Sequence, residues 1–201
     1  MDNTSNNDFL KPKGDYKNLV AYKKAECIYD MTCFFVSHYL PKFGDRTVDQ
    51  MIQAARSGKQ NIVEGNEAGT TSMETAIKLI NVAKASLKEV QADYEDYLRT
   101  HKMIIWDMNN PKFINARQWC REHNQPEDFI KVCNLRDSET VANIALIMLH
   151  QTDYLLRKLI DKFKTDFLEK GGIREQMTSA RREWRDNHKG ENYGTNGNNN
   201  T

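Results

Sequence analysis

The residues best suited to chemistry in this 201-residue chain are a few cysteines and histidines. Cys120 and His123 are spaced as two zinc ligands often are, and Cys133 follows further along the chain. A structural zinc site needs four ligands, and these three have no fourth, so we expect buried free cysteines instead of a metal centre. Gly58-Lys59 is not a phosphate-binding P-loop, because the upstream glycine of that motif would fall at Gln53.

Patterns typical of an enzyme do not occur in the sequence. It contains no Glu-x-x-His pair of the kind that holds two metals in a helical bundle, no HExxH and no GxSxG. The sequence therefore offers no nucleophile or acid–base pair, and we expect a non-enzymatic protein without cofactor or metal. The remaining histidines are scattered along the chain, at His38, His101, His150 and His188.

Composition bounds the cellular context and the class of partner. The chain has 29 Lys and Arg against 28 Asp and Glu, so any binding of nucleic acid must come from a local basic patch or from oligomer geometry. Residues 1–15 are polar, without the apolar segment of a signal peptide, and no apolar run approaches the length of a membrane span. We expect a cytoplasmic protein with reduced thiols and no membrane association.

Long helices must position any site, because glycine and proline are scarce and apolar residues recur at steps of three and four. We predict a first helix from about Asn18 to Tyr39, closed by Pro41. A second helix begins at a Thr47–Gln50 capping box and ends at Gly65 in a left-handed conformation. A Thr71–Glu74 capping box opens the third helix, and Asp137 or Ser138 caps the fourth, which Gly171-Gly172 ends.

The third helix carries the clearest apolar stripe, lasting about four heptads. Its small residues Ala76 and Ala83 predict a close approach by a neighbouring helix, with Gly58 as the candidate facing residue. The stripe consists of Met73, Ala76, Ile80, Ala83, Leu87, Val90, Tyr94 and Tyr97.

These elements predict an all-α protein, an antiparallel up-down-up-down four-helix bundle over residues 16–173. A short helical insertion at about 101–137 separates helices three and four, and a charged C-terminal helix covers 174–189. The Asn-rich ends, 1–15 and 190–201, cannot bury enough apolar area to fold and are expected to be disordered.

Several short segments resemble, in order, a known bacterial family. They are Tyr16–Leu19, Pro41, Ala54-Ala55 before Ser57, Asn61–Gly65 (Asn-Ile-Val-Glu-Gly) and Ala83–Glu89 (Ala-Lys-Ala-Ser-Leu-Lys-Glu). Together they resemble the 23S rRNA intervening-sequence proteins, also called four-helix bundle proteins, and the C-terminal half resembles a longer subfamily with a suffix region. The family usually has Ile-Pro after the serine, where this chain has Gly58-Lys59.

The resemblance implies a homopentamer that binds RNA or other structured nucleic acid. A relative, the accessory variability protein of diversity-generating retroelements, partners a reverse transcriptase. Phosphate contacts are then expected from basic residues on three helices, and these would carry little sequence information. The candidates are Lys17, Lys23 and Lys24 on the first helix, Arg56 and Lys59 on the second, and Arg181, Arg182 and Arg185 near the C-terminus.

One alternative function stays open beside nucleic-acid binding. The near-zero net charge also fits a protein-interaction scaffold, in which the charged residues are solvated helix faces. Trp119 and Trp184 either stack on bases or pack against protein.

Within the family motif, Asn61 and Glu64 share one helical face. A helix C-terminus disfavours a carboxylate, so Glu64 is expected to have a partner, at the start of the third helix or on another subunit.

Overall fold

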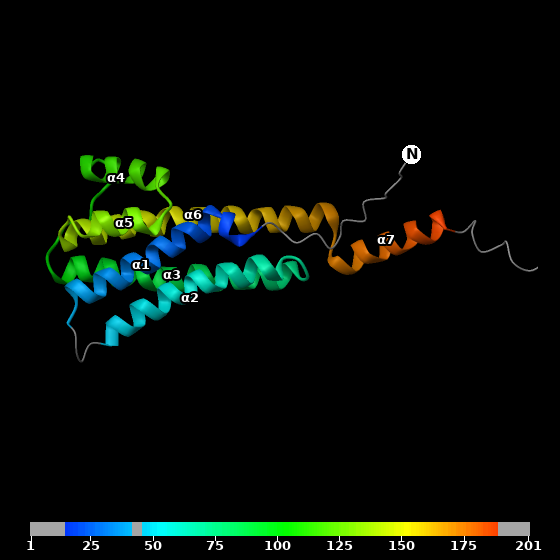
Figure 1. The fold of residues 1–201 in the computed structure, drawn as a ribbon, viewed down its shortest axis with the longest axis horizontal. Helices are drawn as coiled ribbons and strands as arrows, with labels where there is room; N and C mark the ends of the chain where they lie inside the picture. Colours follow the sequence, from blue (N-terminus) through cyan, green and yellow to red (C-terminus); the bar gives the residue numbers. More distant parts are fainter. Residues whose placement is uncertain (1–14, 42–45, 189–201) are drawn as a thin grey trace, which may run out of the picture.

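A computed structural model describes residues 15–41 and 46–188 of the chain (Figure 1). Within those ranges the regular elements are all helices and none is a strand, which confirms the all-α class. No helix in this part of the chain combines the length and the apolar content that crossing a membrane requires. The predicted tails lie outside the described residues, apart from Asp15. The four long helices are α1 (Val20–Tyr39), α2 (Arg46–Ala68), α3 (Met73–Thr100) and α6 (Ser138–Lys170).

The long helices pack side by side, with successive ones running in opposite directions (Figure 1). α2 contacts α1 and α3, and α6 also contacts α1 and α3. Short elements complete the fold: a 3-10 turn, η1 (Tyr16–Asn18), precedes α1, and α4 (Pro111–Glu122) and α5 (Pro126–Cys133) form the predicted insertion. α4 packs on α6, α5 packs on α1, and α7 (Ile173–Asn187) extends beyond the end of α6.

Two glycines on α2 allow a close approach to α3. A Cβ placed on Gly58 would lie 2.6 Å from Leu87 Cδ2, and one on Gly65 would lie 2.7 Å from Ile80 Cδ1. The predicted approach of Gly58 to the Ala83 region is therefore confirmed. The predicted helix stop at Gly65 is wrong: α2 continues to Ala68, and Gly65 is buried within it because side chains of α3 occupy the space of its missing Cβ.

Helix starts differ from the predictions by a residue in two places. Ser72, not Thr71, caps α3, because Ser72 has the extended backbone that a cap needs and its hydroxyl accepts from the Thr75 N–H at 3.2 Å. α2 already includes Arg46, so Thr47 lies inside the helix instead of capping it, and residues 42–45 lie outside the described part. Asp137 caps α6 as predicted, accepting from Thr140 N–H at 2.8 Å.

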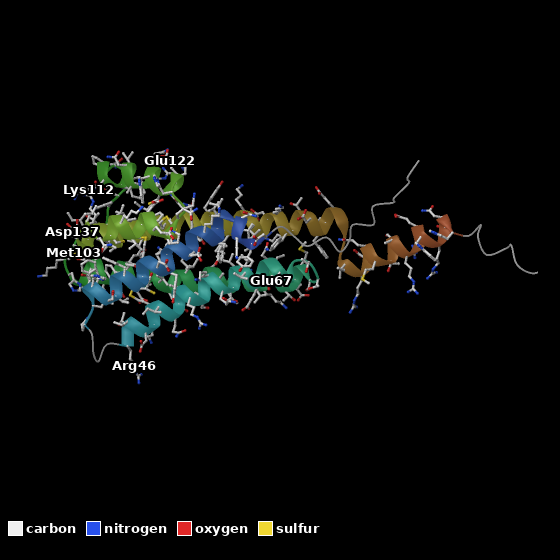
Figure 2. The ribbon with its side chains drawn as sticks, viewed as in Figure 1. Arg46, Glu67, Met103, Lys112, Glu122 and Asp137 are labelled. Atoms are coloured by element: carbon white, nitrogen blue, oxygen red, sulfur yellow. The ribbon has the colours of Figure 1, made fainter. Side chains whose placement is uncertain are left out.

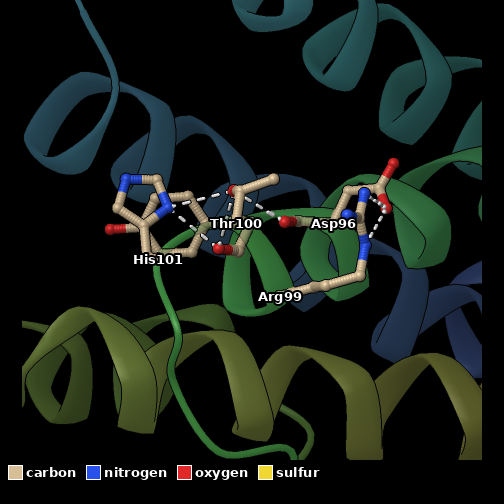
Figure 3. Close-up of polar contacts among 5 residues, drawn as sticks. Asp96, Arg99, Thr100 and His101 are labelled. Carbon is tan, nitrogen blue, oxygen red and sulfur yellow. Dashed lines mark hydrogen bonds and ion pairs between the residues drawn. The ribbon is translucent and has the colours of Figure 1, made fainter.

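Four of the five histidines share one structural role that the sequence analysis missed. Each lies in the last turn of a helix or at its C-cap, four residues after an aromatic residue. The imidazole stacks on that ring and donates from Nδ1 to the carbonyl oxygen of the aromatic residue. At the end of α3, His101 stacks on Tyr97 at 4.1 Å and donates to its carbonyl at 2.9 Å (Figure 3). At the ends of α3, α4 and α7 the same carbonyl also accepts the histidine's own backbone N–H, so the imidazole adds a second hydrogen bond that fixes the last turn of the helix. The other pairs are Phe34–His38, Trp119–His123 and Trp184–His188.

The α2–α3 contact predicts a large effect of substitution at Gly65. Replacing Gly65 with valine places branched carbon where Ile80 now lies, and we expect the free energy of unfolding to fall by about 1–3 kcal/mol in urea titrations. Gln60→Val, an exposed change on the same helix, is the matched control and should change stability by less than about 0.5 kcal/mol. Equal effects at the two positions would contradict this account of Gly65.

Candidate nucleic-acid interface

Lys24 is not a surface residue. Its side chain is 3% exposed, and its ammonium donates to the Cys120 carbonyl oxygen at 2.6 Å, with Met148 Sδ at 3.9 Å. Cys120 lies in the last turn of α4, where carbonyls have no partner within the helix and attract positive charge. Lys24 therefore joins α1 to the insertion, and as packed here it cannot contact a phosphate.

The other predicted cations on η1, α1 and α2 do not form a purely basic patch. Lys17 and Arg56 are exposed, whereas Lys23 and Lys59 are half-buried. Lys59 Nζ lies over the Tyr29 ring, 4.5 Å from its centroid, and its charge also lowers the pKa of Asp30, although burial of that carboxyl is the larger influence and raises the pKa. Asp30 and other acidic neighbours thus offset part of the positive charge where α1 and α2 meet.

The three C-terminal arginines of the predicted set are exposed and share one helix. Arg181, Arg182 and Arg185 are all exposed on α7, which extends away from the four long helices (Figure 1). Helical spacing places Arg182 opposite the apolar residues of α7, while Arg181 flanks them. Trp184 on the same helix is also exposed and stacks on His188.

The family-like motif takes part in helix packing. Asn61 donates to the Ser57 carbonyl at 2.9 Å, and the Ser57 hydroxyl lies 2.9 Å from that of Ser86 on α3. The two matched segments, on α2 and α3, therefore bond to each other beside Gly58. Glu64 is exposed, and among the described residues its carboxylate accepts no hydrogen bond from the start of α3.

A cleft of about 620 Å³ lies between the insertion and α6, which the sequence analysis did not predict. It joins apolar walls from Trp106, Trp119 and Val132 to the cations Lys112 and Arg136. Figure 2 labels Lys112 and Asp137 near one end of the molecule, far from α7. We call it the α4 cleft; the rest of its lining is Asn115, Ala116, Leu135, Asp137, Thr140 and Ile144.

Hydrogen bonds to α6 hold the walls of the α4 cleft. Asn143 accepts from the Trp106 backbone N–H at 2.8 Å and donates to the Ile104 carbonyl at 2.8 Å, which fixes the segment after α3. The hydrogen bonds from Thr140 keep the pKa of the Asp137 carboxyl below its usual value, with a smaller contribution from Lys112 and Arg136. In the sequence, Asn143 within the otherwise apolar run 141–149 was the feature that could have predicted this contact.

The cysteines and histidine first considered as zinc ligands form no such site. Among the described residues, no group of three or more Cys, His, Asp or Glu is placed to hold a metal ion. Burial raises the pKa of the Cys27, Cys120 and Cys133 thiols to about 12, so they stay protonated at neutral pH and are unreactive.

Comparisons of this chain with protein-family models, with curated proteins and with solved structures found no match. The family resemblance therefore depends on the short segments described above, two of which meet at the α2–α3 contact.

Burial of Lys24 predicts a specific pH dependence. Desolvation lowers the pKa of its ammonium below the ordinary 10.5, so the unfolded chain binds more protons here between the two values. Stability conferred by Lys24 relative to Lys24→Met should therefore rise as pH increases toward 10.5. Urea titrations of both proteins from pH 7 to about 10 measure this difference. Lys162→Met, an exposed control, should show no such trend, and a flat Lys24 difference would contradict the assignment.

Proposed function

We propose that this chain is a non-enzymatic, oligomeric helical-bundle protein that binds RNA or other structured nucleic acid. α1, α2, α3 and α6 form its antiparallel four-helix bundle, as in the intervening-sequence family that the chain resembles. The oligomer is a pentamer by that resemblance, and a reverse transcriptase or another protein is a possible partner. Nothing in the comparisons bears on these points, so they depend on the residues and their placement.

Exposure of the arginines on α7 is the observation that carries the proposal. Arg182 and Arg185 are exposed on a helix that extends away from the bundle, so a bulky, rigid polyanion can approach them without displacing packed side chains. Arg181 is exposed beside them, Lys17 and Arg56 are exposed elsewhere, and Lys23 and Lys59 are half-buried. Lys24 is excluded because it is buried.

Contacts of this kind predict salt-dependent binding that charge reversal weakens. We expect Arg182→Glu/Arg185→Glu to reduce affinity for a fluorescent RNA hairpin at least tenfold, and to reduce the slope of log affinity against log salt by about 0.7–0.9 per lost phosphate contact. Fluorescence anisotropy between about 50 and 200 mM salt gives both quantities. The matched control, Lys158→Glu/Lys162→Glu on α6, makes the same change in net charge.

Two results would contradict nucleic-acid binding through α7. Equal loss in the test and control variants would show a nonspecific effect of net charge. Wild-type affinity without salt dependence would rule out phosphate contacts as its source.

A protein-interaction scaffold is the second candidate, and one observation favours it. Large apolar side chains are exposed on the insertion, and one of them, Leu135, lines the α4 cleft, whereas a monomeric protein normally keeps exposed apolar patches small. They are Ile104, Ile105, Met108, Ile114 and Leu135.

A further inference from the structure

The α4 cleft is better suited to apolar side chains than to a nucleotide base. Trp119 is stacked on His123 at 4.3 Å and packed edge-on against Phe129 at 4.9 Å. Trp106 is 7% exposed, and Lys112 Nζ lies over its ring, 5.6 Å from the centroid. The indoles therefore form walls instead of offering open faces for stacking, while Leu135 at the rim is 80% exposed.

A partly exposed apolar stripe at the other end of the chain offers side chains of the kind that such a cleft accepts. Ile173, Met177, Ala180 and Trp184 follow one another at steps of four, three and four, so they share one face of α7. Met177 and Trp184 leave about half of their surfaces exposed, at 49% and 58%, whereas Ile173 is half-buried and Ala180 is buried at 8%. An amphipathic helix laid into an apolar groove is a common mode of recognition. We call these four residues the α7 stripe.

The stripe cannot reach the cleft of its own chain. The last cleft residue on α6 is Ile144, and from there to Lys170 the helix rises about 39 Å at about 1.5 Å per residue. α7 has 15 residues and is about 22 Å long. Even folded straight back at Gly171-Gly172, α7 would end about 17 Å short of Ile144. An α7 that occupies the cleft must therefore come from another chain.

Charges beside the two surfaces are complementary. Helical spacing places Glu183 along one edge of the stripe and Arg181 along the other. The cleft offers Lys112 and Arg136 together with Asp137, so both edges of the helix can meet an opposite charge. Arg182, on the far side of α7 from the stripe, would remain free for phosphate.

We infer that the α4 cleft binds the α7 stripe of a second copy of this chain. This inference depends on the oligomer in the proposed function and does not depend on nucleic-acid binding. Each copy contributes one helix and receives one, so the contact is head-to-tail. Such contacts build a ring, a reciprocal dimer or, where the rotation does not close, a filament.

Complementary single variants test the contact in the full chain. Leu135→Glu damages the cleft rim and Trp184→Glu damages the stripe, and both positions are exposed enough to tolerate the change. Light scattering should show wild-type protein at a multiple of 23.4 kDa and each variant alone dissociating, with a dissociation constant raised at least about tenfold. An equimolar mixture should form a two-chain species, because one intact cleft and one intact stripe remain. Leu168→Glu, a control at a leucine that is 82% exposed outside both surfaces, should keep the wild-type mass.

Each other outcome overturns the inference in a recognisable way. If Leu135→Glu keeps the wild-type mass while Trp184→Glu dissociates, α7 pairs elsewhere, and the proposed oligomer survives without this contact. If both variants dissociate but the mixture does not recover, the surfaces do not bind each other. A wild-type chain that is monomeric at every concentration removes both the inference and the oligomer. A Leu135→Glu protein that keeps its mass but loses RNA makes the cleft an RNA site.

A charge swap gives a second, independent measurement. Glu183→Lys and Lys112→Glu should each weaken association, and the double variant should recover most of the loss, which is the signature of a direct pair. Additive losses would show that the two residues do not meet.

Discussion

Complete burial of the first half of α6 is the constraint on which most of the structure depends. Every residue from Val141 to Leu149 is buried, so this segment needs neighbours on all sides. α1 and α3 cover part of it, and α4 covers another part. Without α4, this face of α6 would present apolar surface to water, at a cost of about 25 cal/mol per Å². The insertion is therefore a structural part of the core and not an appendage.

That requirement accounts for the buried polar residues at the junction. Lys24 satisfies a free carbonyl at the end of α4, and Asn143 satisfies the backbone on either side of Ile105. A buried polar group without such a partner costs more than the bond contributes, so these contacts specify how the insertion sits on α6. The α4 cleft is formed where this packing is incomplete, beside the first turns of α6.

The two ends of α6 differ in how far neighbouring helices cover them. Its first half lies in the core, whereas Phe167 and Leu168 near its end are exposed and α7 continues outward from there. Apolar surface is therefore found near both ends of α6. At its start the α4 cleft lies where α4 packs on it, and beyond its end α7 carries the α7 stripe. The proposed phosphate contact at Arg182 and the proposed contact between copies can coexist on α7, because Arg182 and the α7 stripe lie on opposite faces of the helix.

Local sequence determined the helical class, the long helices, the apolar stripe of α3, the Asp137 cap and the turn at Gly171-Gly172, because each follows from residues within a few turns of one another. The close approach at Gly58 was also predictable, since small residues recurred on both helices. Tertiary structure decided the rest. From the sequence Lys24 is predicted to be a surface lysine, because only the fold brings Cys120, far along the chain, to its ammonium. Gly65 is predicted to stop a helix, because only the fold places Ile80 in the space beside it. The α4 cleft joins residues from Trp106 to Ile144 that share no local pattern, so only their packing reveals it.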